Sequence, residues 1–210
     1  MNNKIITFLT IYICLIGNVY SLTSDEENSI KYLKSKGQGI YDIENYEKEK
    51  RLEIDNNAII RNEELSKLIA LKDLEYLFIE KKTINDEGVK FIGYLKKLKC
   101  LGLRKTQLTD RGMEYIGQLE NLEELNISDT QVTDEGLKHL RNLKKLEELV
   151  LDNTNITGEG FQYINELPNL RVLVVSPKLK GENLRYLGKM KLELLNIAEN
   201  AIDDRAIPYL

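Results

Sequence analysis

The chain has 210 residues, of which 42% are hydrophobic and 30% charged, and its formal net charge is −4. This length is enough for one domain with a substantial core. The small negative charge argues against a nucleic-acid-binding protein, which usually has a strongly basic balance. His139 is the one histidine and there are two cysteines, so no metal site and no cofactor are expected.

The N-terminus predicts a signal peptide over residues 1–21. The apolar run "IITFLTIYICLIG" follows a short polar start, and Val19 and Ser21 are small enough for cleavage after Ser21. A membrane-spanning helix needs about 20 apolar residues, so this run is short for one. We therefore expect a secreted or periplasmic protein. The alternatives are a membrane anchor, if the segment is retained, and a buried first helix.

Residues 22–48 are expected to form an N-terminal helical cap. The stretch "SDEENSIKYLKSKG" predicts a helix that Ser24 caps, with an apolar stripe at Ile30 and Leu33 and an end at Gly37. The end of a stack of repeats needs a polar cover over its otherwise open core. At the other end of the chain, Tyr209 and Leu210 are expected either to fold back over the last repeat or to lie at a frayed or partner-binding edge.

A 24-residue repeat accounts for the rest of the chain. Leucine opens successive copies, with spacings of 24, 24, 24, 24 and 22, at Leu74, Leu98, Leu122, Leu146, Leu170 and Leu192. Glycine recurs every 24 residues at Gly88, Gly112, Gly136 and Gly160. Such registration over many copies indicates a repeat architecture rather than chance.

The pattern "L-x-x-L-x-I-x-x-T-x-V" resembles the leucine-rich repeat. Its second half, "T-D-E-G-L-x-x-L-x-x-L", is similar to the subclass common in bacterial leucine-rich repeat proteins and related to the F-box-associated type. A divergent first copy places Leu52, Ile54, Asn57 and Ile59 on the expected positions. The leucine-rich repeat domain is therefore expected over residues 49–210, as about seven repeats with the last one incomplete.

Each copy combines a short strand with a helix, which predicts an α/β fold. Leu125 and Ile127 alternate along the strand with period two, and Leu137 and Leu140 follow at helical spacing. No single copy closes its own core, but stacked copies do. We therefore expect a leucine-rich repeat solenoid, a horseshoe with a parallel concave sheet and convex helices.

Three further features of the repeat have expected roles. The recurrent glycines make room for the adjacent coil, and the acids at helix starts, such as Asp134 and Glu135, compensate helix dipoles. The alternative for the charges is a docking surface for an anionic partner. Threonine or asparagine at position nine bonds the backbone of the turn. Lys178 breaks that rule next to Pro177, so an irregular turn is expected there.

The solvent-facing strand positions of the concave sheet are the candidate binding surface. Its expected protein-binding residues are Tyr76, Phe78, Arg104, Glu124, Asn126, Ser128, Glu148, Val150, Asp152, Val172, Val174 and Leu194. Cys100 and Gly102 occupy the positions of Tyr76 and Phe78 in the next copy, so they are expected on the same face of the sheet. Exposed aromatic and aliphatic side chains on a sheet often mark interaction sites. The alternative is that β-favouring residues merely suit strands.

The predicted function is non-catalytic binding of a protein partner of unknown identity, with no nucleic acid. No phosphate-binding loop and no nucleophile elbow occurs, and His139 is expected on the solvent side of its helix, so an enzyme is not expected. The resemblance also implies an alternative, a ubiquitin-ligase-type substrate adapter or a host-directed effector. However, residues 22–48 are too few for an F-box, and a leader is inconsistent with a cytosolic adapter.

Overall fold

The computed structural model describes residues 22–43, 46–175, 178–198, 200 and 202. The predicted signal peptide, Pro177 and the two C-terminal residues lie outside this part of the chain. Within the described residues, no helix combines the length and the apolar character needed to cross a bilayer.

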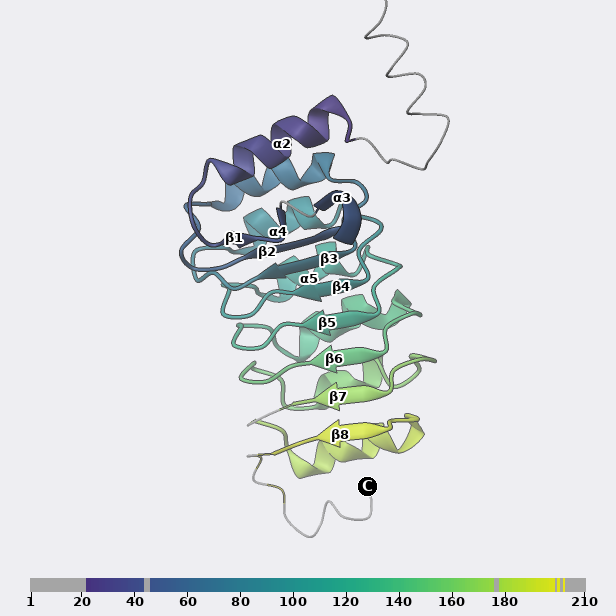
Figure 1. The fold of residues 1–210 in the computed structure, drawn as a ribbon. Coiled ribbons are helices and arrows are strands. Elements are labelled where there is room, and N and C mark those ends of the chain that lie inside the picture. Colours follow the sequence, from purple (N-terminus) through teal and green to yellow (C-terminus); the bar gives the residue numbers. More distant parts are fainter. Residues whose placement is uncertain (1–21, 44–45, 176–177, 199, 201, 203–210) are drawn as a thin grey trace, which may run out of the picture.

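Eight strands of the described residues form one open sheet in chain order (Figure 1). They are β1 (Ile40–Tyr41), β2 (Arg51–Ile54), β3 (Tyr76–Ile79), β4 (Cys100–Gly102), β5 (Glu124–Asn126), β6 (Glu148–Val150), β7 (Val172–Val174) and β8 (Leu194–Asn196). From β2 to β8 every neighbouring pair is parallel. The predicted parallel sheet is therefore confirmed.

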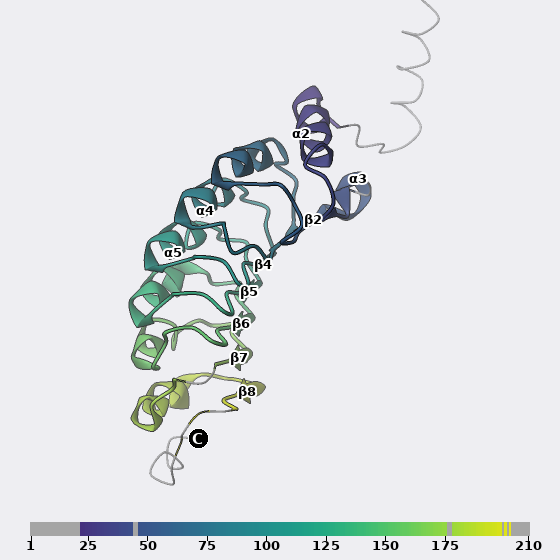
Figure 2. The same ribbon diagram turned by 90° about the vertical axis from the view of Figure 1, so that its left-hand side faces the viewer.

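Helices alternate with these strands along the chain. The α-helices are α2 (Ser24–Lys34), α3 (Tyr46–Glu49), α4 (Asp86–Ile92) and α5 (Asp110–Ile116). The 3-10 helices are η2 (Asn62–Ala70), η3 (Asp134–Asn142), η4 (Glu159–Tyr163) and η5 (Gly181–Lys189). Figure 2 shows an arc with strands along its inner side and repeat helices along its outer side. The predicted solenoid with a concave sheet is confirmed.

One continuous apolar core runs through the stack. Leu125, Leu149 and Leu173 are in register on adjacent strands and at most 1% exposed. Apolar residues of every copy join the same cluster, from Ile30 in the first helix to Leu187 in η5. Because each copy buries its leucines against its neighbours, the alternate strand positions are left on the concave face.

The N-terminal segment covers the first coil, with one strand more than expected. Helix α2 packs against η2, and β1 pairs antiparallel with β2. Thr23, not Ser24, is the N-cap of α2: its side chain accepts from the Glu26 amide, and the Glu26 carboxylate accepts from the Thr23 amide. The helix also ends before the predicted stop, because Ser35 is its C-cap.

The first copy is one residue longer than predicted between its strand and its helix. Leu52 and Leu77 are in register as expected. Ile59, however, is 72% exposed, whereas Ala58 and Ile60 are each 2% exposed. The expectation that Ile59 faces the core is therefore wrong. Asn57 is also exposed, and its amide nitrogen donates to Asp55 instead of tying the turn to a neighbouring coil.

Threonine at position nine closes the turn inside its own coil. The buried hydroxyls of Thr106, Thr130 and Thr154 donate to the carbonyls of Leu103, Ile127 and Leu151 at 2.7–2.8 Å. Asn200 bonds differently, since its amide donates to Val175 in the preceding coil and to Ile197 in its own coil, both at 2.9 Å. Threonine thus satisfies a buried carbonyl but ties no coils together.

Aspartates at helix starts join neighbouring coils. The Asp110 carboxylate accepts from the Thr133 amide at 2.8 Å and from the Thr133 hydroxyl at 2.7 Å. Asp86 bonds Thr109 in the same way, at 2.9 and 2.6 Å. Dipole compensation is the role that the sequence predicts, yet each aspartate also satisfies donors 23 residues ahead. We call this contact the aspartate bridge.

The recurrent glycines leave space for the aspartate bridge. A Cβ atom added to Gly112 would lie 2.4 Å from Asp86 Oδ1, and one added to Gly136 would lie 2.6 Å from Asp110 Oδ1. At Gly160 the obstacle is backbone, the Asp134 carbonyl oxygen at 2.5 Å. Any side chain at these positions would collide with the preceding coil, which confirms the predicted packing role.

The sequence predicts an irregular turn between β7 and β8. Pro177 lies outside the described residues, so that expectation stays a prediction. Despite the 22-residue spacing, Leu173 and Leu195 remain in register. The Lys178 ammonium donates to Asn155 in the preceding coil at 2.6 Å.

Candidate functional site

Two columns of side chains cross the concave face from strand to strand. The first column, in register from β2 to β8, is Arg51, Tyr76, Cys100, Glu124, Glu148, Val172 and Leu194. The second column is Glu53, Phe78, Gly102, Asn126, Val150, Val174 and Asn196. The sheet therefore assembles most of the predicted binding residues into one surface, although they come from separate copies.

The N-terminal part of the surface holds an aromatic side chain over a glycine. A Cβ atom added to Gly102 would lie 2.8 Å from Phe78 Cδ1, so the ring occupies the space that a side chain on β4 would fill. The Arg51 guanidinium lies 4.4 Å from the centre of the same ring. These residues line an open hollow of about 230 Å³. Phe78 is thus held between two neighbours and only partly exposed.

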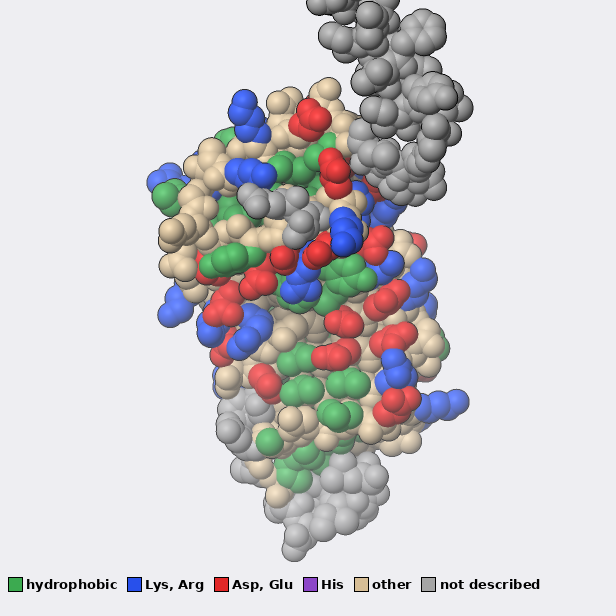
Figure 3. Space-filling view, in the orientation of Figure 1, with side chains coloured by type: hydrophobic (Ala, Val, Ile, Leu, Met, Phe, Trp, Pro, Cys, Tyr) green, Lys and Arg blue, Asp and Glu red, His purple; other side chains and the backbone are tan. Residues whose placement is uncertain are grey.

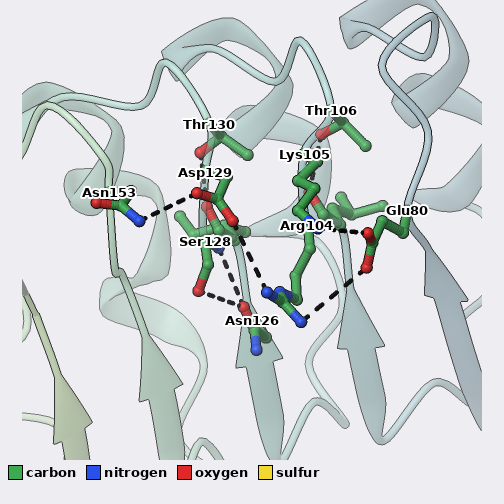
Figure 4. A network of polar contacts seen from close by, with 11 residues as sticks. Glu80, Arg104, Lys105, Thr106, Asn126, Ser128, Asp129, Thr130 and Asn153 are labelled. Carbon is green, nitrogen blue, oxygen red and sulfur yellow. Dashed lines mark hydrogen bonds and ion pairs between the residues drawn. The ribbon is translucent and has the colours of Figure 1, made fainter.

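Arg104 lies between two acids beside this hollow. Its guanidinium is 4.0 Å from the Glu80 carboxylate and 3.8 Å from that of Asp129, as Figure 4 shows. Asn126 accepts two hydrogen bonds from Ser128, one from the amide and one from the hydroxyl. Ser128 is only 4% exposed. The expectation that Ser128 faces solvent is therefore wrong, because its hydroxyl turns back toward Asn126, the last residue of β5.

Cys100 is predicted to lie on the exposed concave surface, but it is only 7% exposed. Its thiol donates to Glu124 Oε2 at 3.1 Å. Burial, and then the hydrogen bond to Glu124, raise the pKa of the Cys100 thiol to about 12. The thiol is therefore neutral at physiological pH and poorly nucleophilic.

The Cys100 thiol is expected to react with iodoacetamide about 100-fold more slowly in the native protein at pH 8 than in urea. The native pKa lies above the ordinary value of 9.0, so between pH 9 and about 12 only the unfolded chain loses this proton, and stability falls as pH rises. Peptide mapping by mass spectrometry measures the rate at Cys100. Glu124→Gln is expected to accelerate native labelling, and equal native and unfolded rates would contradict the prediction.

Two adjacent acids occupy the middle of the first column. Glu124 and Glu148 are in-register neighbours on β5 and β6. Within the described residues, the Glu124 carboxylate accepts one hydrogen bond, from the Cys100 thiol. Neither Glu124 nor Glu148 forms an ion pair within those residues. Like charges on directly neighbouring strands destabilise a sheet. We call these two residues the acidic pair.

An apolar patch lies on the C-terminal side of the acidic pair. Its members are Val150, Val172, Val174 and Leu194, of which the valines are partly exposed and Leu194 is 49% exposed. Figure 3 shows hydrophobic side chains gathered on the lower part of this face, with acidic side chains beside them. Asp152 follows Val150 by two residues in the same coil and is partly exposed. The sheet thus places apolar and acidic groups side by side on a rigid support.

Residues suited to catalysis do not converge in the part of the chain that the structure describes. No group of three or more histidine, cysteine and acidic side chains there is placed to hold a metal ion. His139 is partly exposed on η3, next to Lys138 and Arg141 on the helical side. The predicted absence of a metal, a cofactor and an enzymatic activity stays a prediction.

Comparisons with known proteins agree with this architecture. A family model described as "Leucine Rich repeat" matches residues 118–140. An internalin, InlF from Listeria monocytogenes, is 26% identical, with a TM-score of 0.53, and the match covers 70% of this chain and 41% of the internalin. This chain therefore spans less than half of that protein. No curated protein matches.

Two plant structures match this chain with lower identity and lower TM-scores. The plant peptide hormone receptor RGFR1, solved in complex with RGF2, is 22% identical over 69% of this chain and 24% of its own, with a TM-score of 0.48. The leucine-rich-repeat ectodomain of the receptor kinase SOBIR1 from Arabidopsis thaliana is 19% identical, with a TM-score of 0.45. The match covers 73% of this chain and 92% of the SOBIR1 chain.

Proposed function

Because the chain is a leucine-rich repeat protein, we propose that it binds a protein partner on its concave face, without a covalent step. The observation that carries this proposal is the apolar patch beside the acidic pair. Partly exposed aliphatic side chains lower their free energy when a partner covers them, and unpaired carboxylates attract basic groups. A stacked solenoid presents both on a rigid surface, which reduces the entropy that binding costs.

The proposed contact residues are those that the sheet leaves accessible. Tyr76 and Phe78 provide aromatic surface at the N-terminal end, and Arg104 provides a cation beside them. The acidic pair and Asp152 lie in the middle of the concave surface, and the apolar patch forms its C-terminal part. Asn126 lies between the two ends, and its amide nitrogen carries no hydrogen bond within the described residues (Figure 4). Ser128 is left out because it is buried.

A photo-crosslinking amino acid at position 174 is the direct test. We expect it to capture a partner from the source organism that the same amino acid at Gln162, an exposed residue of η4, does not capture. The identified partner is then purified and its affinity measured. Capture at both positions or at neither would remove the concave face from the proposal.

Charge reversal of the acids is expected to weaken binding of that purified partner by about tenfold or more. The variant is Glu124→Lys, Glu148→Lys and Asp152→Lys together. A matched control with the same change in net charge reverses Glu114, Glu120 and Glu166, which are exposed outside the sheet. Equal affinities of the two folded variants, measured by calorimetry, would show that the acids of the concave face take no part.

We also propose that the mature chain begins at Leu22 and acts outside the cytoplasm. The apolar run before Ser21 supports this, and so does its limited length. Cell fractionation with N-terminal sequencing tests it. An intact Met1 in the cytosol would favour the adapter or effector alternative, and an intact Met1 in the membrane fraction would favour a retained anchor.

A further inference from the structure

The acidic pair and the apolar patch form one polarised strip across β5, β6, β7 and β8. In the first column the order is Glu124, Glu148, Val172, Leu194, and in the second it is Asn126, Val150, Val174, Asn196. The acidic residues lie on β5 and β6, whereas the apolar residues lie on β6, β7 and β8, so the surface changes from acidic to apolar along the axis of the solenoid. A complementary ligand needs a matching change along its own length.

We propose that the occupant of this strip is an amphipathic α-helix of the partner, with lysine or arginine in one half of its contact face and aliphatic residues in the other half. The helix lies across the strands, along the axis of the stack. This inference rests on the proposed function and specifies the partner class for the same surface.

The spacing of the strands favours a helix over an extended segment. Neighbouring strands lie about 4.8 Å apart. Residues three and four apart on one face of a helix advance about 4.5 and 6 Å along its axis, so successive contact residues follow successive strands. Alternate residues of an extended chain advance about 6.6 Å and fall out of step with the strands after two contacts. A helix also satisfies its own backbone, which matters because β5, β6 and β7 already pair with strands on both sides.

Charge decides which residues the helix carries over β5 and β6. Within the described residues no lysine or arginine pairs with Glu124 or Glu148, although acids nearby on the strand flank are paired, such as Glu147 with Arg171. The acidic pair therefore keeps its mutual repulsion in the free protein. Basic side chains of a bound helix remove that repulsion and gain two attractive contacts, whereas an acidic helix would add to it.

The apolar half sets the other end of the helix. Val172 and Leu194 in one column, with Val150 and Val174 in the other, make a four-residue platform on three neighbouring strands. Aliphatic residues one helical turn apart contact successive strands of this platform. A helix of about 18 residues is about 27 Å long, which is more than the four strands span.

Synthetic helical peptides test the inference directly. The probe is a lactam-bridged peptide of about 18 residues with lysines in one half of a face and leucines in the other half. Its control has the same composition but places lysines and leucines on opposite faces. We expect the probe to bind with a micromolar dissociation constant in fluorescence anisotropy, and the control to bind at least about tenfold more weakly.

Charge exchange makes the test specific to the strip. The Glu124→Lys, Glu148→Lys variant is expected to lose affinity for the lysine probe about tenfold and to gain affinity for a probe with glutamate in place of lysine. Val174→Asp is expected to weaken both probes. The Glu114, Glu120 and Glu166 reversal is the matched control and should leave the lysine probe unaffected.

Equal binding of the probe and its opposite-face control, or no effect of the charge exchange, would overturn the helix inference. If neither peptide binds but position 174 still crosslinks to the native partner, the helix inference fails while the proposed concave-face function stands. If the crosslink also fails, both fall. Crosslinked fragments of the native partner that map to an extended or acidic segment would likewise overturn only the helix inference.

Discussion

Replacement of Asp134 by alanine is expected to lower the free energy of unfolding by about 3 kcal/mol. The Asp134 carboxylate accepts from the Thr157 hydroxyl at 2.7 Å and from the amides of Thr157, Gly158 and Gly160 at 2.8–3.1 Å. Alanine leaves three backbone donors without a partner in a partly buried joint. Urea unfolding followed by circular dichroism measures the loss.

Glu135→Ala is the matched control for the aspartate bridge. Both acids lie in the first turn of η3, so both substitutions remove the same favourable interaction with the helix dipole. Glu135, however, is exposed, and among the residues that the structure describes it pairs only with Lys138, at 3.3 Å within its own helix. We expect Glu135→Ala to cost about 0.5 kcal/mol or less. Equal losses for the two variants would mean that dipole compensation, and not the bridge, explains Asp134.

The sequence predicted the fold because periodicity and burial have the same cause. A 24-residue spacing of leucines places successive copies in register only if the copies stack, and the strand pairs Leu101–Leu125 and Leu125–Leu149 follow that spacing. The concave columns are the alternate residues of those strands. The repeat pattern alone is therefore enough to place Tyr76, Val150 and Val174 on the surface.

Local details were less predictable because neighbouring residues satisfied the same pattern. In the first copy Ile59 and Ile60 are both apolar, so the sequence does not show which one the extra residue turns inward. Thr23 and Ser24 are both good N-caps, and only the Glu26 contact distinguishes them. The burial of Cys100 and Ser128 depends on the side chains of adjacent strands, which no single copy reveals.

The aspartate bridge was missed because a local explanation was sufficient. An acid in the first turn of a helix is stabilising by itself, so "T-D-E-G" needed no second role. The signal was nevertheless present, since aspartate or asparagine precedes the glycine of the next copy by 26 residues at Asn62, Asp86 and Asp110. A fixed spacing between different residue types, rather than between identical ones, indicates contact between coils.

Gly160→Ala is expected to destabilise the protein by about 3 kcal/mol, because the added methyl group would collide with the backbone of the preceding coil. The added Cβ would lie 2.5 Å from the Asp134 carbonyl oxygen and 2.9 Å from Asp134 Cα. Both atoms are backbone, so the clash cannot be relieved by a side-chain rotation and the two coils must separate. That separation also lengthens the bridge from Asp134 to the Gly160 amide.

Gly188→Ala provides the control, because it is the same chemical change in η5 with no heavy atom within 4 Å of the new Cβ. There the methyl group restricts the unfolded chain and is expected to stabilise the protein by about 0.5 kcal/mol. Thermal and urea unfolding of the two variants should therefore shift in opposite directions. If Gly160→Ala unfolded like the wild type, adjacent coils would be too loosely packed for the aspartate bridge to form, and the rigid concave surface that depends on their stacking would be lost with it.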